Sequence, residues 1–153
     1  MQSPNRQLIV VAFTLLLGSS PGWVTAESAK LDDRSTGALT VHVQGLKSDD
    51  GKLRFVLFDS EKTFMKHPIR EEISEIQDRQ STWSINELPY GTYAVLVHHD
   101  VNASGTMERH WYGKPKEPTG ASNDAPAEFG PPKFKHAKFQ LETPELTLTI
   151  TIK

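Results

Sequence analysis

Cysteine is absent from this chain of 153 residues. Its absence excludes disulfide bonds, thiolate catalysis and cysteine-ligated metal sites. Any folded domain here must therefore be stabilised by its apolar core alone, and a chain of this length is the size of one such domain.

Long apolar runs are also absent. The longest, Leu8–Leu17, holds ten residues interrupted only by Thr14, whereas a membrane-spanning helix needs roughly 20. Arg6 precedes this run, glycine and proline follow it, and Val24 and Ala26 place small side chains where a signal peptidase reads them. This pattern predicts a cleavable signal peptide over residues 1–26 rather than an N-terminal anchor helix. We expect an exported protein, periplasmic or extracellular, and the lack of cysteine fits a bacterial envelope protein better than a eukaryotic secreted module.

An excess of basic charge is missing too. The chain has 17 Lys and Arg against 19 Asp and Glu, and only Arg6 lies in the signal segment, so residues 27–153 carry 16 basic and 19 acidic side chains, a net charge of −3. No cluster of Lys or Arg marks one face, which argues against a nucleic-acid partner. No apolar segment in residues 27–153 is long enough to span a membrane either.

The familiar motifs of nucleophilic and phosphate chemistry are likewise absent. The chain has no Gly-x-Ser-x-Gly elbow and no glycine-rich loop after a strand. Its paired acids, Asp49-Asp50 and Glu71-Glu72, lie in polar runs typical of a solvated surface. These absences favour a non-catalytic protein.

What is present is apolar alternation with period two, the pattern of half-buried strands. We expect a flexible leader over residues 27–37 and one domain over residues 38–153. The predicted strands follow apolar residues in these segments: 39–44, 53–58, 82–85, 92–98, 134–141 and 146–152.

Three segments are less regular. The Asp50-Gly51 pair favours a hairpin between the first two strands. Ser60 is placed to cap a short helix through Met65. Residues 69–77 have isoleucines at helical spacing, but so short a segment after a proline favours a strand.

The longest segment without regular pattern is residues 100–132, which hold five prolines and four glycines. A loop of this length in a compact domain is usually functional. About seven short strands separated by turns, with no long helix, predict an all-β domain: a single β-sandwich of immunoglobulin-like or prealbumin-like topology with one long Pro/Gly-rich loop.

Several motifs resemble those of known exported sandwiches. A Leu-Pro-x-Gly-x-Tyr turn entering a core strand resembles prealbumin-like and immunoglobulin-like domains. The full set, in order, is Leu88-Pro89-Tyr90-Gly91-Thr92-Tyr93, His99-Asp100-Val101-Asn102-Ala103-Ser104-Gly105, Tyr112-Gly113-Lys114-Pro115, Ser122-Asn123 and Phe129-Gly130-Pro131-Pro132-Lys133-Phe134. Over residues 39–152 the chain resembles the bacterial secreted family called domain of unknown function 2141. The resemblance implies an exported β-sandwich and no established activity. The family's usual loop has the form Asp-x-Asn-x-Asn-Gly followed by an Asp. Here Ser104 stands in place of the second asparagine of that motif, and Glu108 stands near the position of the last acid.

The long loop opens with a pattern of oxygen side chains. Alternating oxygen ligands followed by glycine are typical of the start of an EF-hand-type calcium loop. Position twelve of such a loop, counted from Asp100, normally holds a bidentate glutamate, but here it is Trp111. We therefore expect weak calcium binding, with a dissociation constant of about 10⁻⁴–10⁻³ M. The alternative is a polar loop in which Asp100 and Asn102 bond their own backbone and Gly105 takes a positive φ. The candidate calcium ligands are Asp100, Asn102, Ser104, Thr106 and Glu108.

Histidines offer a second candidate metal site, because imidazole suits zinc, copper or nickel. His98 and His99 are adjacent in a predicted strand and so point to opposite faces. One of them could share a metal only with His110 near the end of the same loop. We take His99 and His110 as the candidate pair, against the alternative that they are ordinary surface or core residues.

Aromatic residues give the third candidate. Trp111, Tyr112 and Phe129 lie in the long loop. If exposed, they form a docking surface for polysaccharide or a partner protein. The interpretation favoured by their size is that they cover one open end of the sandwich. The sequence as a whole predicts a non-catalytic envelope binding or accessory protein, with calcium as a candidate cofactor. The alternatives are a polysaccharide- or protein-docking module that uses residues 111–134 and a histidine-dependent metal-binding protein.

Overall fold

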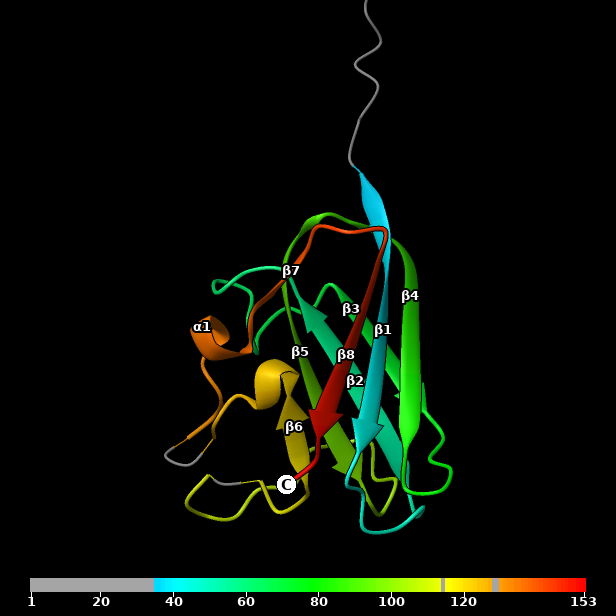
Figure 1. Cartoon of the computed structure of the whole chain (residues 1–153). Helices are drawn as coiled ribbons and strands as arrows, with labels where there is room; N and C mark the ends of the chain where they lie inside the picture. The colour runs from blue at the N-terminus through cyan, green and yellow to red at the C-terminus, as the bar shows by residue number, and fades with distance from the viewer. Residues whose placement is uncertain (1–34, 114, 128–129) are drawn as a thin grey trace, which may run out of the picture. The chain divides into compact units, whose positions relative to one another are not determined.

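The computed structural model describes residues 35–113, 115–127 and 130–153. These residues form eight strands, one single-turn 3-10 helix and one short α-helix (Figure 1). The elements are β1 (Thr36–Gln44), β2 (Lys52–Phe58), β3 (Arg70–Ser74), β4 (Ser81–Pro89), β5 (Gly91–Asp100), β6 (Thr119–Ala121), η1 (Ser122–Asp124), α1 (Phe134–Ala137), β7 (Phe139–Leu141) and β8 (Glu145–Thr151).

The strands form two sheets, and the predicted β-sandwich is confirmed. The three-stranded sheet has the order β4-β1-β8, with β1 antiparallel to β4 and parallel to β8. The larger sheet has the order β3-β2-β5-β6, and β7 also pairs with β5. No helix within the described ranges is long and apolar enough to cross a membrane. The immunoglobulin-like or prealbumin-like topology remains a prediction.

The core lies between the sheets and follows the predicted alternation. Every second residue of β1, β2 and β5 faces inward and is almost fully buried, because strand side chains alternate between faces. These inward residues are Leu39, Val41, Val43, Leu53, Phe55, Leu57, Tyr93, Val95 and Val97. Trp83 of β4 completes this core by packing its ring against Phe55, with 5.5 Å between centroids.

Strand β5 is buried on its outer face as well. A smaller apolar cluster covers Ala94 there, and its aromatic rings come from the last residue of β2, from the turn that follows β2, and from α1. Phe64 contacts Phe58 and Phe134 edge-on, at 5.1 and 5.5 Å between centroids. Burial on both faces explains why residues 92–98 give the strongest strand pattern in the sequence.

The turn between β4 and β5 is locked by a tyrosine. The Tyr93 hydroxyl donates to the carbonyl of Pro89 at 2.7 Å. This bond, from a tyrosine at the start of a strand to backbone just upstream, is the tyrosine corner of many β-sandwiches. The Leu-Pro-x-Gly-x-Tyr motif therefore has a structural role here.

The predicted hairpin at Asp50-Gly51 is wrong. Strands β1 and β2 belong to different sheets, so the turn passes between the sheets instead of joining paired neighbours. Gly51 does adopt a positive φ of 75°, but the reason is space: a Cβ there would lie 2.0 Å from the carbonyl oxygen of Asp100.

Two other local predictions need correction. The expected helix from Ser60 to Met65 is a series of turns, although the backbone N–H of Thr63 donates to Ser60 Oγ at 3.4 Å as an N-cap would. The expected strand over 134–141 is instead the short helix α1 followed by β7. Helix α1 forms because Phe134 and Ala137, three residues apart, both turn into the outer apolar cluster.

Segment boundaries also differ from expectation. Strand β1 begins at Thr36, two residues inside the segment assigned to the leader. Residues 27–34 of that leader, and the whole predicted signal peptide, lie outside the described residues. Residues 69–77 contain a strand, as favoured, but a shorter one, β3. The long loop, expected to lack regular structure over 100–132, contains β6 and η1.

Candidate functional site: the loop between β5 and β6

The loop after β5 is organised by the carboxylate of Asp100. Oδ1 accepts the backbone N–H of Ser104 at 2.9 Å, and Oδ2 accepts that of Gly105 at 2.7 Å. Asp100 is 6% exposed, and Gly105 has a φ of 78°. Both carboxylate oxygens are thus occupied by backbone donors, which is the arrangement expected of a polar loop that bonds its own backbone.

The other proposed calcium ligands are also engaged within the loop. Asn102 Oδ1 accepts the backbone N–H of Ser104 at 3.1 Å, and Asn102 Nδ2 donates to Glu108 Oε1 at 3.2 Å. Ser104 Oγ donates to the Thr106 carbonyl at 3.1 Å. Within the described ranges, no group of three or more His, Asp or Glu side chains is arranged to hold a metal. These side chains bond within the loop, as the polar-loop alternative expects, and calcium binding stays a prediction.

The pKa of Asp100 reflects these contacts. Burial acts to raise the pKa of the carboxyl group, but hydrogen bonds from Gly105 and Ser104 and the nearby His98 outweigh it, and the pKa is lowered from its ordinary value. A carboxylate whose pKa is lower in the folded than in the unfolded state adds stability above the unfolded value, and this stability is lost as pH falls through the folded value.

This shift leads to a pH prediction. We expect Asp100→Asn to lower the free energy of unfolding by about 2 kcal/mol at pH 7, because it weakens two hydrogen bonds to a charged group. The difference between wild type and variant should begin to shrink as pH falls below about 4, the ordinary aspartate pKa, and should continue to shrink toward the lower pKa of the folded Asp100 carboxyl group. Urea unfolding at pH 7 and pH 3 measures both values, and a difference that is the same at both pH values contradicts the proposed role of the charge.

The candidate histidine pair is divided between two environments. His99 is 1% exposed, and its Nε2 lies 2.8 Å from the carbonyl oxygen of Asp50. The other ring nitrogen, Nδ1, is buried and has no hydrogen-bond partner among the described residues. His110 is exposed and stacks on Tyr112, with 5.1 Å between centroids. The two imidazoles are therefore engaged with different partners.

His98 makes a contact that the sequence did not reveal. Its Nε2 lies 2.6 Å from Glu117 Oε2, and both side chains are less than one tenth exposed. The second oxygen of Glu117 accepts the backbone N–H of Val101 at 3.2 Å. Glu117 thus fastens the far end of the loop to β5. Nothing in the sequence around it, a lysine and a proline, distinguishes it from a surface acid.

Arg54 attaches the loop to the neighbouring strands. From β2, its Nη2 donates to the carbonyl of Gly105 at 3.3 Å, and its Nη1 lies 3.3 Å from the carboxylate of Glu71 on β3. With Asp100 and Glu117, this arginine holds the base of the loop against the larger sheet.

From this base projects a short hairpin, which we call the aromatic hairpin (residues 108–113 and 115–116). The backbone N–H of Lys116 donates to the Glu108 carbonyl at 3.0 Å, and that of Gly113 donates to the His110 carbonyl at 2.8 Å. Gly113 has a φ of 88°, which glycine adopts without strain. The turn is closed further by Arg109, whose Nη1 donates to the Gly113 carbonyl at 3.0 Å.

Aromatic side chains occupy the turn of this hairpin. Trp111 is 96% exposed and Tyr112 is 57% exposed. The interpretation that these residues cover an open end of the sandwich is wrong, because the hairpin carries both rings away from the core. Phe129, the third aromatic, lies outside the described residues. The exposed arrangement is the one required of a docking surface.

The Ser122-Asn123 motif has a structural role. Ser122 is fully buried, and its Oγ accepts the backbone N–H of Val95 at 3.0 Å and donates to the carbonyl of Ala137 at 2.5 Å. Asn123, with a φ of 59°, donates from Nδ2 to the carbonyl of Lys138 at 2.8 Å. The motif joins β5 to the segment between α1 and β7.

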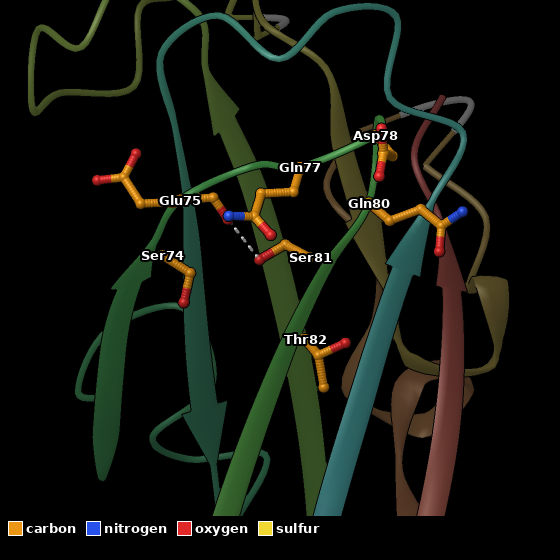
Figure 2. Close-up of a pocket in the computed structure, with 7 residues that line it drawn as sticks. All are labelled: Ser74, Glu75, Gln77, Asp78, Gln80, Ser81 and Thr82. Atoms are coloured by element: carbon orange, nitrogen blue, oxygen red, sulfur yellow. Dashed lines mark hydrogen bonds between the residues drawn. The ribbon is translucent and has the colours of Figure 1, made fainter.

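Two surface depressions lie elsewhere, along the edge formed by β3 and β4. The larger is open and has a volume of about 520 Å³, and Figure 2 shows its lining of hydroxyl, amide and carboxyl groups. Ser81 Oγ donates there to the carbonyl of Glu75 at 2.9 Å. Small-molecule sites are usually concave and mostly apolar, so this depression does not have the features of one. The smaller depression, of about 300 Å³, is lined mainly by charged residues of β3 and by residues 83–86 of β4.

Comparison with known proteins gives one match. Neither a curated protein nor a solved structure matches the chain. A family model described as "Uncharacterized protein conserved in bacteria (DUF2141)" matches residues 41–149, more than half of the chain and all of the loop described above. The protein therefore belongs to the bacterial family of domain of unknown function 2141.

Proposed function

We propose that this protein is an exported, non-catalytic binding module of the bacterial envelope, and that the turn of the aromatic hairpin is its contact surface. The observation that carries the proposal is Trp111, which is 96% exposed on a hairpin closed by its own hydrogen bonds. A large exposed aromatic ring is a candidate contact residue, because tryptophan is enriched at interfaces and among the residues that dominate binding energy.

The base of the loop supports this proposal. The charged groups of Asp100, Arg54 and Glu117 are all hydrogen-bonded to the backbone at the base of the loop. Their common effect is to fix the loop on the sheet. A contact residue held on an ordered base loses less conformational entropy when it binds.

The first test is the variant Trp111→Ala. We expect its free energy of unfolding to stay within about 0.5 kcal/mol of wild type, because the side chain makes few intramolecular contacts. We expect its binding to isolated bacterial envelopes to fall at least about tenfold, because the apolar area of the ring no longer leaves water on binding. Co-sedimentation of the exported protein, produced from the full-length gene, with isolated envelopes measures the binding.

A matched control is Trp83→Phe, which changes the other tryptophan of the described domain. Trp83 is 7% exposed in the core, so this variant should lose stability and keep its envelope binding while folded. If Trp111→Ala binds envelopes as wild type does, the hairpin is not the contact surface and the proposal is wrong.

Calcium remains an alternative ligand for residues 100–108. Each oxygen of Asp100 already accepts one backbone N–H, which leaves only part of the carboxylate free to bind a calcium ion. We therefore expect the melting curve in millimolar calcium to coincide with the curve in chelator. A rise of several degrees with calcium would instead show that the ion orders the loop, since a ligand that binds only the folded state raises its stability.

Export is part of the same proposal. We expect the mature protein to begin at Glu27, after the Val24-Thr25-Ala26 segment. Mass spectrometry of the protein recovered from the periplasm and the medium tests the cleavage position and the compartment together.

A further inference from the structure

We propose that the surface recognised by the aromatic hairpin is the interfacial layer of a lipid membrane that contains anionic headgroups. This inference rests on the proposed function and names its partner. It is carried by the kinds of side chain at the turn, by the convex position of these side chains, and by the charges beside them.

The side chains at the turn are those that prefer a membrane–water interface. Trp111 and Tyr112 combine an apolar ring with a polar group, and such residues form the aromatic belts of membrane proteins. Trp111 packs edge-on against Tyr112 with 5.4 Å between ring centroids. His110 stacks on Tyr112 with an angle of 10° between the ring planes. Met107, the residue before the hairpin, is also 36% exposed.

The position of these rings favours a soft surface over a shaped ligand. Trp111 is 96% exposed because it lies in the turn itself. Small ligands bind in concave sites, and both surface depressions described above lie along β3 and β4, on the opposite edge of the larger sheet from β6. A stable protein interface buries about 800 Å² on each partner, which is more than a turn with two exposed rings offers. A convex turn can instead enter the headgroup layer of a membrane.

Charge favours the same end of the molecule. Arg109 is exposed beside the turn, and the Lys116 side chain is 49% exposed on the other strand of the hairpin. Glu108 is the only acid among the described hairpin residues, and Lys116 Nζ lies 3.4 Å from its carboxylate. One acid and two bases give the described hairpin a charge of +1, whereas residues 27–153 carry −3. Anionic headgroups attract basic side chains near the surface, so they should orient the domain with its hairpin toward the membrane.

The test uses vesicles of phosphatidylglycerol and phosphatidylethanolamine and the exported protein. We expect co-flotation with these vesicles and a blue shift of tryptophan fluorescence. Trp111→Ala should weaken vesicle binding at least about tenfold, because the ring supplies most of the apolar area that enters the interface. Binding should also weaken with added salt and on vesicles of phosphatidylcholine alone, since the headgroup attraction is screened or removed.

The matched control is Ile69→Ala. Ile69 is 42% exposed, and its backbone N–H donates to the carbonyl of Leu57, near the last residue of β2. Asp100, where the loop begins, pairs instead with Lys52, the first residue of β2. This variant removes exposed apolar area far from the hairpin and should bind vesicles as wild type does. If both variants lose binding equally, non-specific apolar contact explains the result and the inference is wrong.

Other outcomes separate the inference from the proposal on which it rests. If the protein binds isolated envelopes through Trp111 but does not bind vesicles, the membrane inference is overturned and the binding module stands. Binding to purified peptidoglycan or envelope polysaccharide in the same assay would then identify a carbohydrate partner. If neither envelopes nor vesicles are bound, both the inference and the proposed function fail.

Discussion

Gly51→Ala is expected to lower the free energy of unfolding by about 3 kcal/mol. A Cβ at this position would lie 2.0 Å from the carbonyl oxygen of Asp100 and 2.6 Å from that of Val101. Both contacts are with backbone, so relief requires the turn to move away from the end of β5. The cost combines strain at a φ of 75°, about 1 kcal/mol, with overpacking of about 2 kcal/mol.

Gly105 provides a matched control for this prediction. It has a φ of 78°, close to that of Gly51, but a Cβ there would meet no atom within 4 Å. Gly105→Ala should therefore show only the strain, about 1 kcal/mol. Urea unfolding of both variants separates the two contributions, and equal losses of stability would show that the close approach of the two backbones at Gly51 is not real.

Ser122→Ala is expected to cost about 3 kcal/mol of stability. Strand β5 changes its edge partner along its length, from β7 at residues 91–93 to β6 at residues 96–98. The hydroxyl of Ser122 fills the gap by accepting the N–H of Val95 and donating to the carbonyl of Ala137. Removal of this hydroxyl leaves a buried donor and a buried acceptor unpaired, at about 1–3 kcal/mol for each.

Hydrogen exchange makes this prediction specific. In Ser122→Ala the amide of Val95 should exchange faster by more than the loss of global stability explains, because its bond partner is gone. The exposed Ser84 of β4 serves as the control, and Ser84→Ala should change neither stability nor exchange at Val95. If the amide of Val95 stays protected in Ser122→Ala, the hydroxyl does not bridge the gap.

The strands were largely predictable from sequence, because alternation reports which side chains face a core. Leu39, Val41 and Val43 are buried as their spacing predicts, and so are the inward residues of β5. The pairing of strands was not predictable. Asp50-Gly51 has the composition of a hairpin turn, but the turn crosses between sheets, and only the position of Asp100 explains the glycine.

The candidate site was predictable in part. The pattern from Asp100 to Gly105 indicated an ordered polar loop, and the structure shows its backbone-bonded form. Glu117 was missed because a buried pair with His98 leaves no trace in the spacing of the sequence. The predicted burial of Trp111 was wrong, because the prediction relied on the average burial of aromatic residues. In the turn of a projecting hairpin the tertiary structure leaves such a ring exposed.

Accessibility of Trp111 tests the central claim most directly. If the predicted cleavage follows residue 26, the mature chain retains Trp83 in the core and Trp111 on the hairpin. Acrylamide quenching of the free protein should therefore show one accessible and one protected tryptophan, and isolated envelopes should protect the accessible one. Two protected tryptophans in the free protein, or an exposed Trp111 that stays equally quenchable with envelopes present, would contradict the account.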